Sequence, residues 1–87
     1  MTMFSISPTL RTAVDRDGVV ILDVRRGAVV TLNVTGGYIW RMVQAGKSVD
    51  EIVNGLALDT GEDPLSIAGD IHQFLDQLLA NHLIALR

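Results

Sequence analysis

The stretch LNVTGGYIWRMVQ, residues 32–44, decides the fold of this chain. It joins an apolar segment to a segment of helical periodicity through an Asn-x-Thr-Gly-Gly turn, and Trp40, the single Trp of the sequence, lies one turn into the helix. We expect Thr35 to cap this helix and Gly46 to end it. The stretch contains no reactive group, so its role is predicted to be architectural, with Trp40 as a core anchor.

Three strand-like segments precede this corner. They span residues 9–14, 19–24 and 28–32, and the second of them is nearly continuous in apolar residues. Short turns at residues 15–18 and 25–27 connect them, which favours antiparallel hairpins in the spatial order one-two-three. We expect the second strand to be central and buried on both faces.

Two further helices follow the corner. Residues 48–51, SVDE, have the pattern of a capping box, and the apolar residues after them recur at helical spacing. Residues 60–62 interrupt this helix, and Asp63 with Pro64 opens a third helix that we expect to end near Asn81. The apolar residues of the third helix cover about half of its circumference, more than one core contact requires, so part of this arc is available to a partner.

The composition excludes several classes of protein. The length of 87 residues allows one domain, which we expect to span residues 1–87. The absence of cysteine excludes a disulfide framework and thiol chemistry and is compatible with the cytoplasm, where we expect the protein. Neither a signal peptide nor an apolar run approaching the ~20 residues of a membrane span is apparent. The formal net charge of −3 argues against binding to nucleic acid.

The sequence offers no convergent set of catalytic groups. His72 and His82 are separated by about 80° around the third helix, so they cannot ligate a metal together as an i, i+4 pair can. The DRDG turn at residues 15–18 lacks the later ligands of a calcium loop, and Gly36-Gly37 lacks the spacing and the Lys of a phosphate loop. We therefore expect a protein that is not an enzyme and that holds no metal or cofactor.

The third strand, residues 28–32, is predicted to be an open edge of the sheet. Natural edge strands are protected by Lys, Pro, bulges or inward charges, and this strand has none of them. An extended peptide could pair with such an edge through main-chain hydrogen bonds, while side-chain pockets supply specificity. The alternative is that another element or a second subunit covers the edge, and the sequence pattern does not decide between the two.

An ordered set of motifs runs along the chain from about residue 10 to residue 86. Its members are Asp23, Leu32-Asn33-x-Thr35-Gly36-x-x-Ile39-Trp40, Gly46-x-Ser48-Val49-x-Glu51-Ile52, Asp70-Ile71-x-x-Phe74-Leu75-x-x-Leu78 and Leu83-Ile84. Together they resemble the PqqD-like family, the leader-peptide recognition elements of pathways that modify ribosomally made peptides. The Asn-x-Thr-Gly turn and the Trp are most similar to the stand-alone leader-binding proteins of lasso peptide biosynthesis. His82 departs from the family, which often has Gly before Leu-Ile.

The resemblance implies an α+β, winged-helix-like fold with a three-stranded antiparallel sheet followed by three helices. It also implies that the leader of a precursor peptide adds as a fourth strand along the third strand, in a groove floored by the third helix. Carried over residue by residue, the peptide-binding positions are Ala28, Val29, Val30, Thr31, Leu32, Ile67, Asp70, Ile71, Phe74, Leu75 and Leu78.

The function implied by the resemblance is non-catalytic. The protein would capture the leader and deliver the precursor to a separate, transglutaminase-like leader peptidase and then to a cyclase. Arg25, Arg26 and Asp70 could pair with charged leader side chains, although exposed ion pairs contribute only about 0–1 kcal/mol.

Three alternatives remain open. A winged-helix transcriptional regulator would need a basic recognition helix, but the second and third predicted helices contain no Lys or Arg. The second alternative is a peptide chaperone of pyrroloquinoline quinone biosynthesis; these relatives usually have a different turn and no Trp. The third is a homodimer joined edge to edge.

Overall fold

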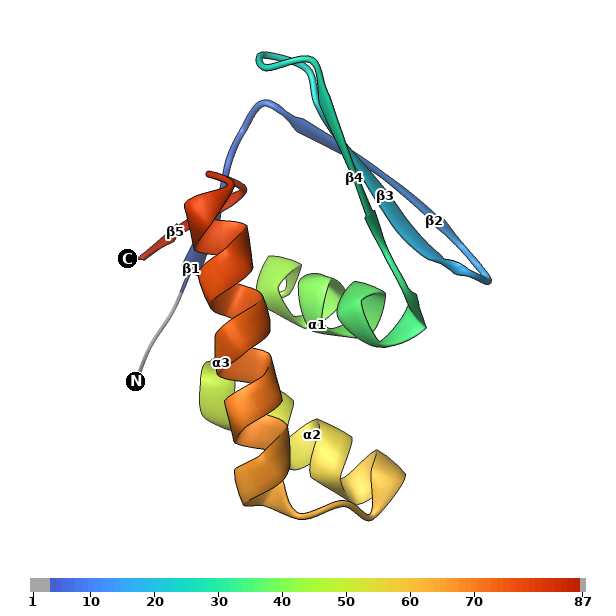
Figure 1. Ribbon diagram of the computed structural model, residues 1–87, viewed down its shortest axis with the longest axis vertical. Helices are drawn as coiled ribbons and strands as arrows, with labels where there is room; N and C mark the ends of the chain where they lie inside the picture. The colour runs from blue at the N-terminus through green and yellow to red at the C-terminus, as the bar shows by residue number, and fades with distance from the viewer. Residues whose placement is uncertain (1–3, 87) are drawn as a thin grey trace.

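A computed structural model describes residues 4–86 of the chain (Figure 1). Its elements in chain order are β1 (Phe4–Ile6), β2 (Leu10–Asp15), β3 (Gly18–Asp23), β4 (Ala28–Leu32), α1 (Val34–Gln44), α2 (Val49–Thr60), α3 (Pro64–Ala80) and β5 (Ile84–Leu86). The single domain predicted over residues 1–87 includes residues 1–3 and 87, which lie outside the described part. Most of the residues on which the expectation of no signal peptide rests also lie outside it. Between residues 4 and 86, no helix is long and apolar enough to cross a membrane.

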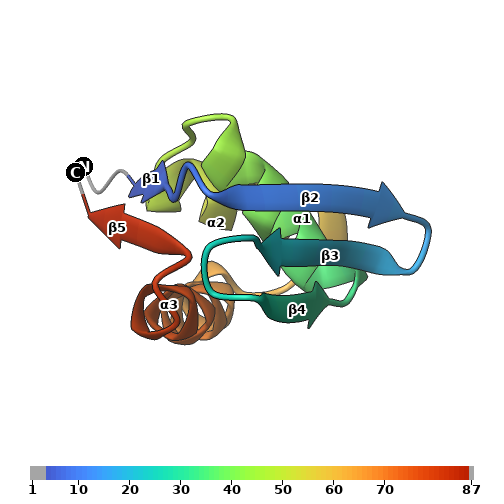
Figure 2. The same cartoon turned by 90° about the horizontal axis from the view of Figure 1, so that it is seen from above.

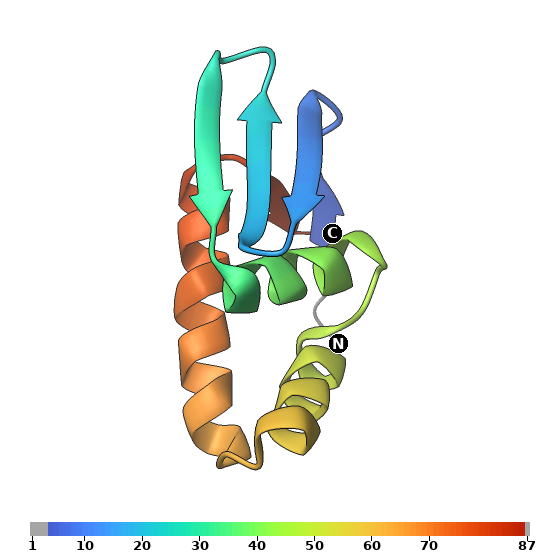
Figure 3. The same ribbon diagram turned by 90° about the vertical axis from the view of Figure 1, so that its right-hand side faces the viewer.

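The three central strands form an antiparallel sheet in the order β2-β3-β4, as predicted. The register pairs Asp15 with Gly18 across a two-residue turn, and Val19 with Leu32 on the other side of β3. The strands stand above the helices, with β4 on the side of α3 (Figure 3).

Strands β1 and β5 form a second, two-stranded sheet that was not predicted from the sequence (Figure 2). Its register runs from Phe4 opposite Leu86 to Ile6 opposite Ile84. Strands of three residues are too short to show the alternation that identifies a strand in a sequence. The pairing brings the two ends of the described chain together.

The prediction that the second strand is buried on both faces was wrong. On β3, Ile21 is fully buried, whereas Val20 and Leu22 are 37% and 40% exposed. The helix α1 packs against one face of the sheet (Figure 2), and within residues 4–86 no element covers the other face. An apolar run of this length is compatible with burial on one face or on two, and a chain this short has helices for only one.

The first helix begins two residues earlier than predicted, at Val34, and its cap is Asn33 rather than Thr35. The Asn33 Oδ1 atom accepts a hydrogen bond from the Gly36 amide at 2.8 Å, which satisfies one of the free N–H groups of the first turn. The helix ends as predicted, with Gly46 in the left-handed conformation at φ +80°. Trp40 is fully buried.

The predicted boundaries of α2 and α3 are confirmed. The Ser48 hydroxyl accepts from the Glu51 amide at 3.3 Å, and the Glu51 carboxylate accepts from the Ser48 amide at 3.0 Å, which completes the capping box. Asp63 caps α3 with Pro64 in its first turn, and the helix ends at Ala80. The core is formed by the inner face of the sheet, by residues of all three helices and by the β1–β5 pair.

Candidate functional site

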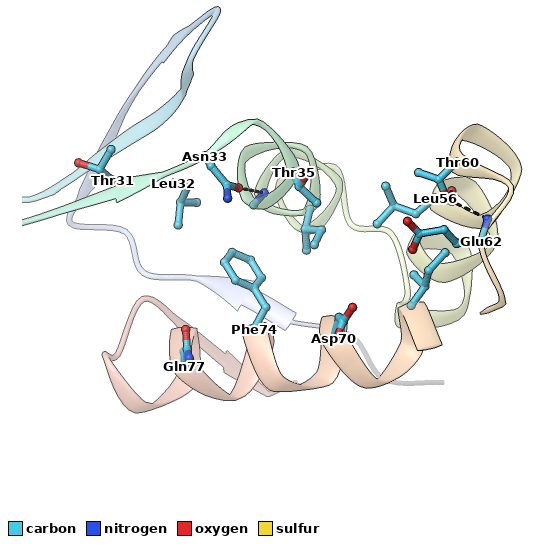
Figure 4. Close-up of a pocket in the computed structure, with 13 residues that line it drawn as sticks. Thr31, Leu32, Asn33, Thr35, Leu56, Thr60, Glu62, Asp70, Phe74 and Gln77 are labelled. Carbon is cyan, nitrogen blue, oxygen red and sulfur yellow. Dashed lines mark hydrogen bonds between the residues drawn. The ribbon is translucent and has the colours of Figure 1, made fainter. Parts of the chain in front are cut away.

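A cavity of about 480 Å³ opens between the end of β4, the first turn of α1, the end of α2 and one face of α3 (Figure 4). We call it the β4–α3 groove. Its apolar part is formed by Leu32, Ile39, Leu56, Ile67 and Phe74. These side chains come from all four elements, so the groove exists only in the folded chain.

Phe74 is the main apolar wall of the groove. Its ring projects from α3 toward Leu32 and the start of α1 and is half-buried (Figure 4). A Cβ atom on Gly36 would come within 3.3 Å of Phe74 Cε1, so the glycine in the Asn-x-Thr-Gly turn lets the first turn of α1 approach the ring.

The rim of the groove is polar and acidic. Glu62 and Asp70 contribute exposed carboxylates, and no Lys, Arg or His is among the described residues that line the groove. The Thr60 hydroxyl donates to the Leu56 carbonyl at 2.8 Å and accepts from the Glu62 amide at 3.2 Å, which fixes the backbone of the turn that carries Glu62. The groove therefore combines an apolar floor with two negative charges.

The hydrogen-bonding phase of the sheet determines which backbone groups of β4 are free. Just beyond the β2–β3 ladder, the Val24 amide donates to the Thr9 carbonyl at 3.2 Å. Because bonded residues alternate along an antiparallel strand, the even-numbered residues of β3 bond to β2 and the odd-numbered ones bond to β4. These odd-numbered residues pair with the even-numbered residues of β4. The N–H and C=O groups of Val29 and Thr31 therefore point away from β3.

The predicted open edge is confirmed in the described part of the chain. Strand β4 pairs with β3 on one side only, and its other side has no strand partner within residues 4–86. Strand β2 forms the opposite edge of the same sheet. Of the two edges, it is the end of β4 that borders the groove, through Thr31 and Leu32.

The predicted peptide-binding residues divide into three groups. Those that line the groove are Thr31, Leu32, Ile67, Asp70 and Phe74. Those that lie along β4 beyond the groove are Ala28, Val29 and Val30. Those that do not line the groove and are at most 3% exposed, in the core, are Ile71, Leu75 and Leu78.

The division on α3 follows from the helical period. Residues 71, 75 and 78 form the buried stripe, while residues 70, 74 and 77 have the same spacing shifted by one position and line the groove. Gln77 belongs to the second set and was missed, although its i+7 relation to Asp70 was a usable signal. Thr60 and Glu62 were missed because only the tertiary fold brings the end of α2 to the groove.

Comparisons with known proteins agree with this geometry. The family model described as coenzyme PQQ synthesis protein D (PqqD) matches residues 18–84. The solved structure of TbiB1 in complex with the TbiA(β) leader peptide is similar at a TM-score of 0.87, with 29% identity over 92% of this chain and 93% of that chain. A lasso peptide synthetase B1 complexed with the leader peptide has the same TM-score, with 24% identity over 94% and 96% of the two chains, and this likeness concerns the fold alone. No curated protein matches the sequence. The likenesses confirm the predicted α+β, winged-helix-like fold.

Proposed function

The chain belongs to the family of coenzyme PQQ synthesis protein D, and from this premise we propose that it is a non-catalytic binding protein for the leader segment of a ribosomally made precursor peptide. The leader adds to β4 as a further antiparallel strand. The observation that carries the proposal is that Val29 and Thr31 direct backbone groups, which pair with no other strand of residues 4–86, to an open edge that ends at the β4–α3 groove. The leader peptide in the TbiB1 complex supports it.

Strand addition uses two kinds of contact. The outward N–H and C=O groups of Val29 and Thr31 provide four backbone hydrogen bonds, each worth about 0.5–1.5 kcal/mol net, and these fix the register of the guest. A guest residue opposite Leu32 has its side chain on the same face as Leu32 and enters the groove beside Phe74. An apolar guest residue at that position removes water from the ring and supplies specificity.

The proposed pathway is that of a lasso peptide, in which the chain delivers the bound precursor to a transglutaminase-like leader peptidase and then to a cyclase. The likeness to TbiB1 favours this pathway. The description of the matched family favours a second candidate, a peptide chaperone of pyrroloquinoline quinone biosynthesis, in which the same edge binds a different peptide.

The test is a titration of the full chain with a synthetic, fluorescein-labelled leader peptide, taken from a short precursor reading frame that neighbours this gene. We expect micromolar or tighter binding by fluorescence anisotropy. Thr31→Pro removes an outward N–H and is expected to weaken binding at least tenfold. The matched control is Thr12→Pro on β2, whose N–H points outward from the opposite edge and whose loss leaves binding unchanged.

Each other outcome contradicts a defined part of the proposal. Absence of binding by the wild-type chain refutes leader recognition. Binding that is insensitive to Thr31→Pro, or equally sensitive to Thr12→Pro, refutes addition to β4. A dimer in analytical ultracentrifugation that Thr31→Pro dissociates and the leader does not would assign the edge to self-association. Delivery is tested by the rate at which the purified peptidase cleaves the precursor with and without this chain.

A further inference from the structure

A second cavity, of about 300 Å³, lies where the β3–β4 turn, the β1–β2 link and the turn after α3 come together. It is lined by Ser7, Thr9, Asp23, Arg25, Arg26 and His82. We call it the arginine cavity. Its lining contrasts with the acidic rim of the β4–α3 groove, which adjoins the other end of β4.

The carboxylate of the arginine cavity is already satisfied within the protein. Asp23 is only 4% exposed, and its Oδ1 atom accepts from the Thr9 hydroxyl at 3.2 Å and from the Arg26 amide at 3.3 Å. Its Oδ2 atom lies 3.9 Å from Arg26 Nε, so the Arg26 guanidinium is partly neutralised. Asp23 therefore serves to hold the β3–β4 turn and to orient Arg26.

The positive charge of Arg25 is not compensated in this way. Arg25 is exposed and forms no ion pair with any of residues 4–86. With one carboxylate and two guanidinium groups, the cavity has a formal charge of +1 when His82 is neutral. The Thr9 hydroxyl already donates to Asp23, so Ser7, whose hydroxyl lies 3.1 Å from that of Thr9, donates to Thr9. The groups that suit the lining to an anion are therefore the guanidinium groups.

His82 is held beside this cavity by a strained backbone conformation. Its φ of +60° lies in the left-handed region that side chains other than glycine rarely adopt. The amides of His82 and Leu83 donate to the carbonyls of Leu79 and Leu78, both at 3.0 Å, which is the hydrogen-bond pattern of a Schellman ending. The position suits glycine better, yet this chain places there an imidazole that can donate a hydrogen bond into the cavity.

Resting on the proposed addition of a guest strand to β4, we propose that the arginine cavity is a subsite that binds a carboxylate side chain of the guest. Ala28 is the register partner of Asp23, so the two side chains lie on the same face of the sheet. A guest residue opposite Ala28 projects from that face toward the arginine cavity, and the long side chain of Arg25 can reach it.

The geometry also sets the order of the guest residues. An antiparallel guest strand runs from Leu32 toward Ala28. In the sequence of the guest, the residue opposite Leu32, which enters the groove, therefore comes four positions before the residue opposite Ala28. At about 3.3 Å per residue the two positions lie about 13 Å apart, beyond the Debye length of about 8 Å in physiological salt. The acidic rim with Glu62 and Asp70 therefore disfavours a carboxylate at the first position, while Arg25 favours one at the second.

The experiment is a charge reversal on the full chain with the leader peptide used above. Arg25→Glu is expected to weaken binding about 5- to 30-fold. The control Arg16→Glu, on the exposed β2–β3 turn, changes the net charge equally and is expected to stay within twofold of wild type. In the peptide, Lys replaces the acidic residue that lies four positions after the groove residue. We expect this peptide to bind the wild-type chain weakly. We expect it to bind the Arg25→Glu variant more tightly than it binds the wild-type chain.

Failure of this inference is distinguishable from failure of the proposed function. If the wild-type chain binds the leader but Arg25→Glu and Arg16→Glu behave alike, the subsite is refuted and strand addition stands. A leader that binds tightly without an acidic residue at that position refutes the subsite as well. If the wild-type chain does not bind the leader at all, the proposed function fails, and the subsite fails with it.

Discussion

Gly37 in the first turn of α1 lies against Val19 of β3 so closely that a Cβ atom at Gly37 would come within 2.8 Å of Val19 Cγ2. Val19 is 2% exposed and belongs to the hydrophobic core. Gly37→Ala is therefore expected to lower the free energy of unfolding by about 1–3 kcal/mol, even though alanine favours a helix. Urea unfolding measures the change, and a variant as stable as wild type would contradict this close packing.

The neighbouring Gly36 provides the contrast. A Cβ there would lie 3.3 Å from Phe74 Cε1, and this ring is half-buried at the groove and able to shift. We expect Gly36→Ala to change the free energy of unfolding by less than about 1 kcal/mol, because the gain in helix propensity offsets the contact. Binding of the leader peptide is expected to weaken, since the displaced ring narrows the groove. Unchanged affinity for the leader peptide would show that Phe74 does not contact the leader.

The phase of β4 predicts opposite effects for two adjacent prolines. The Val30 amide points to β3, so Val30→Pro is expected to cost about 1–3 kcal/mol by leaving its acceptor without a partner. The Thr31 amide points outward, so Thr31→Pro is expected to cost less than about 1 kcal/mol. In hydrogen exchange of the free protein, we expect the Val30 amide to be protected and the amides of Val29 and Thr31 to exchange rapidly. The reverse order would mean that the opposite set of amides faces the open edge.

The capping box predicts a pH dependence of stability. Hydrogen bonds from the backbone and the side chain of Ser48, with the charge of Lys47, lower the pKa of Glu51 from its ordinary value of 4.5. Because the pKa of Glu51 is lower in the folded state, its stabilising contribution is present above pH 4.5 and is lost as the pH falls through the folded pKa. Melting temperatures between pH 3 and 6 are expected to depend less on pH for Glu51→Gln than for wild type. Parallel curves would show that Glu51 does not contribute.

The strained His82 predicts a stabilising substitution. His82→Gly is expected to raise the free energy of unfolding by about 1 kcal/mol, because glycine adopts a positive φ without the steric cost of a Cβ. The comparison is Gly46→Ala at φ +80°, which ends α1 in the same conformation and is expected to lower stability by a similar amount. If His82→Gly is less stable than wild type, contacts of the imidazole outweigh the backbone strain.

Local signals in the sequence predicted the features that depend on neighbouring residues. The capping box at residues 48–51, the Asp63-Pro64 start of α3 and the turns between strands each rest on hydrogen bonds within a few residues. Thr35 was the exception, because Asn33, two residues earlier, also has a side-chain acceptor and is the one that reaches the Gly36 amide.

Features that depend on contacts between distant segments could not be predicted in the same way. The apolar run of β3 did not reveal that one face lacks a covering layer. The pairing of β1 with β5 joins segments about eighty residues apart, and neither is long enough to show a period. On α3 the sequence identified a wide apolar arc, but the position of α1 and the sheet decides that Phe74 faces the groove and Ile71 the core.

The pairing of Phe4 with Leu86 has a consequence for engineering. Since β1 and β5 lie side by side, a short linker could join their outer ends, and new ends could be opened at the two-residue turn between Asp15 and Gly18. Such a circular permutant would keep β4 and the groove intact. By the same geometry, the domain could be inserted as a unit into a surface loop of another protein.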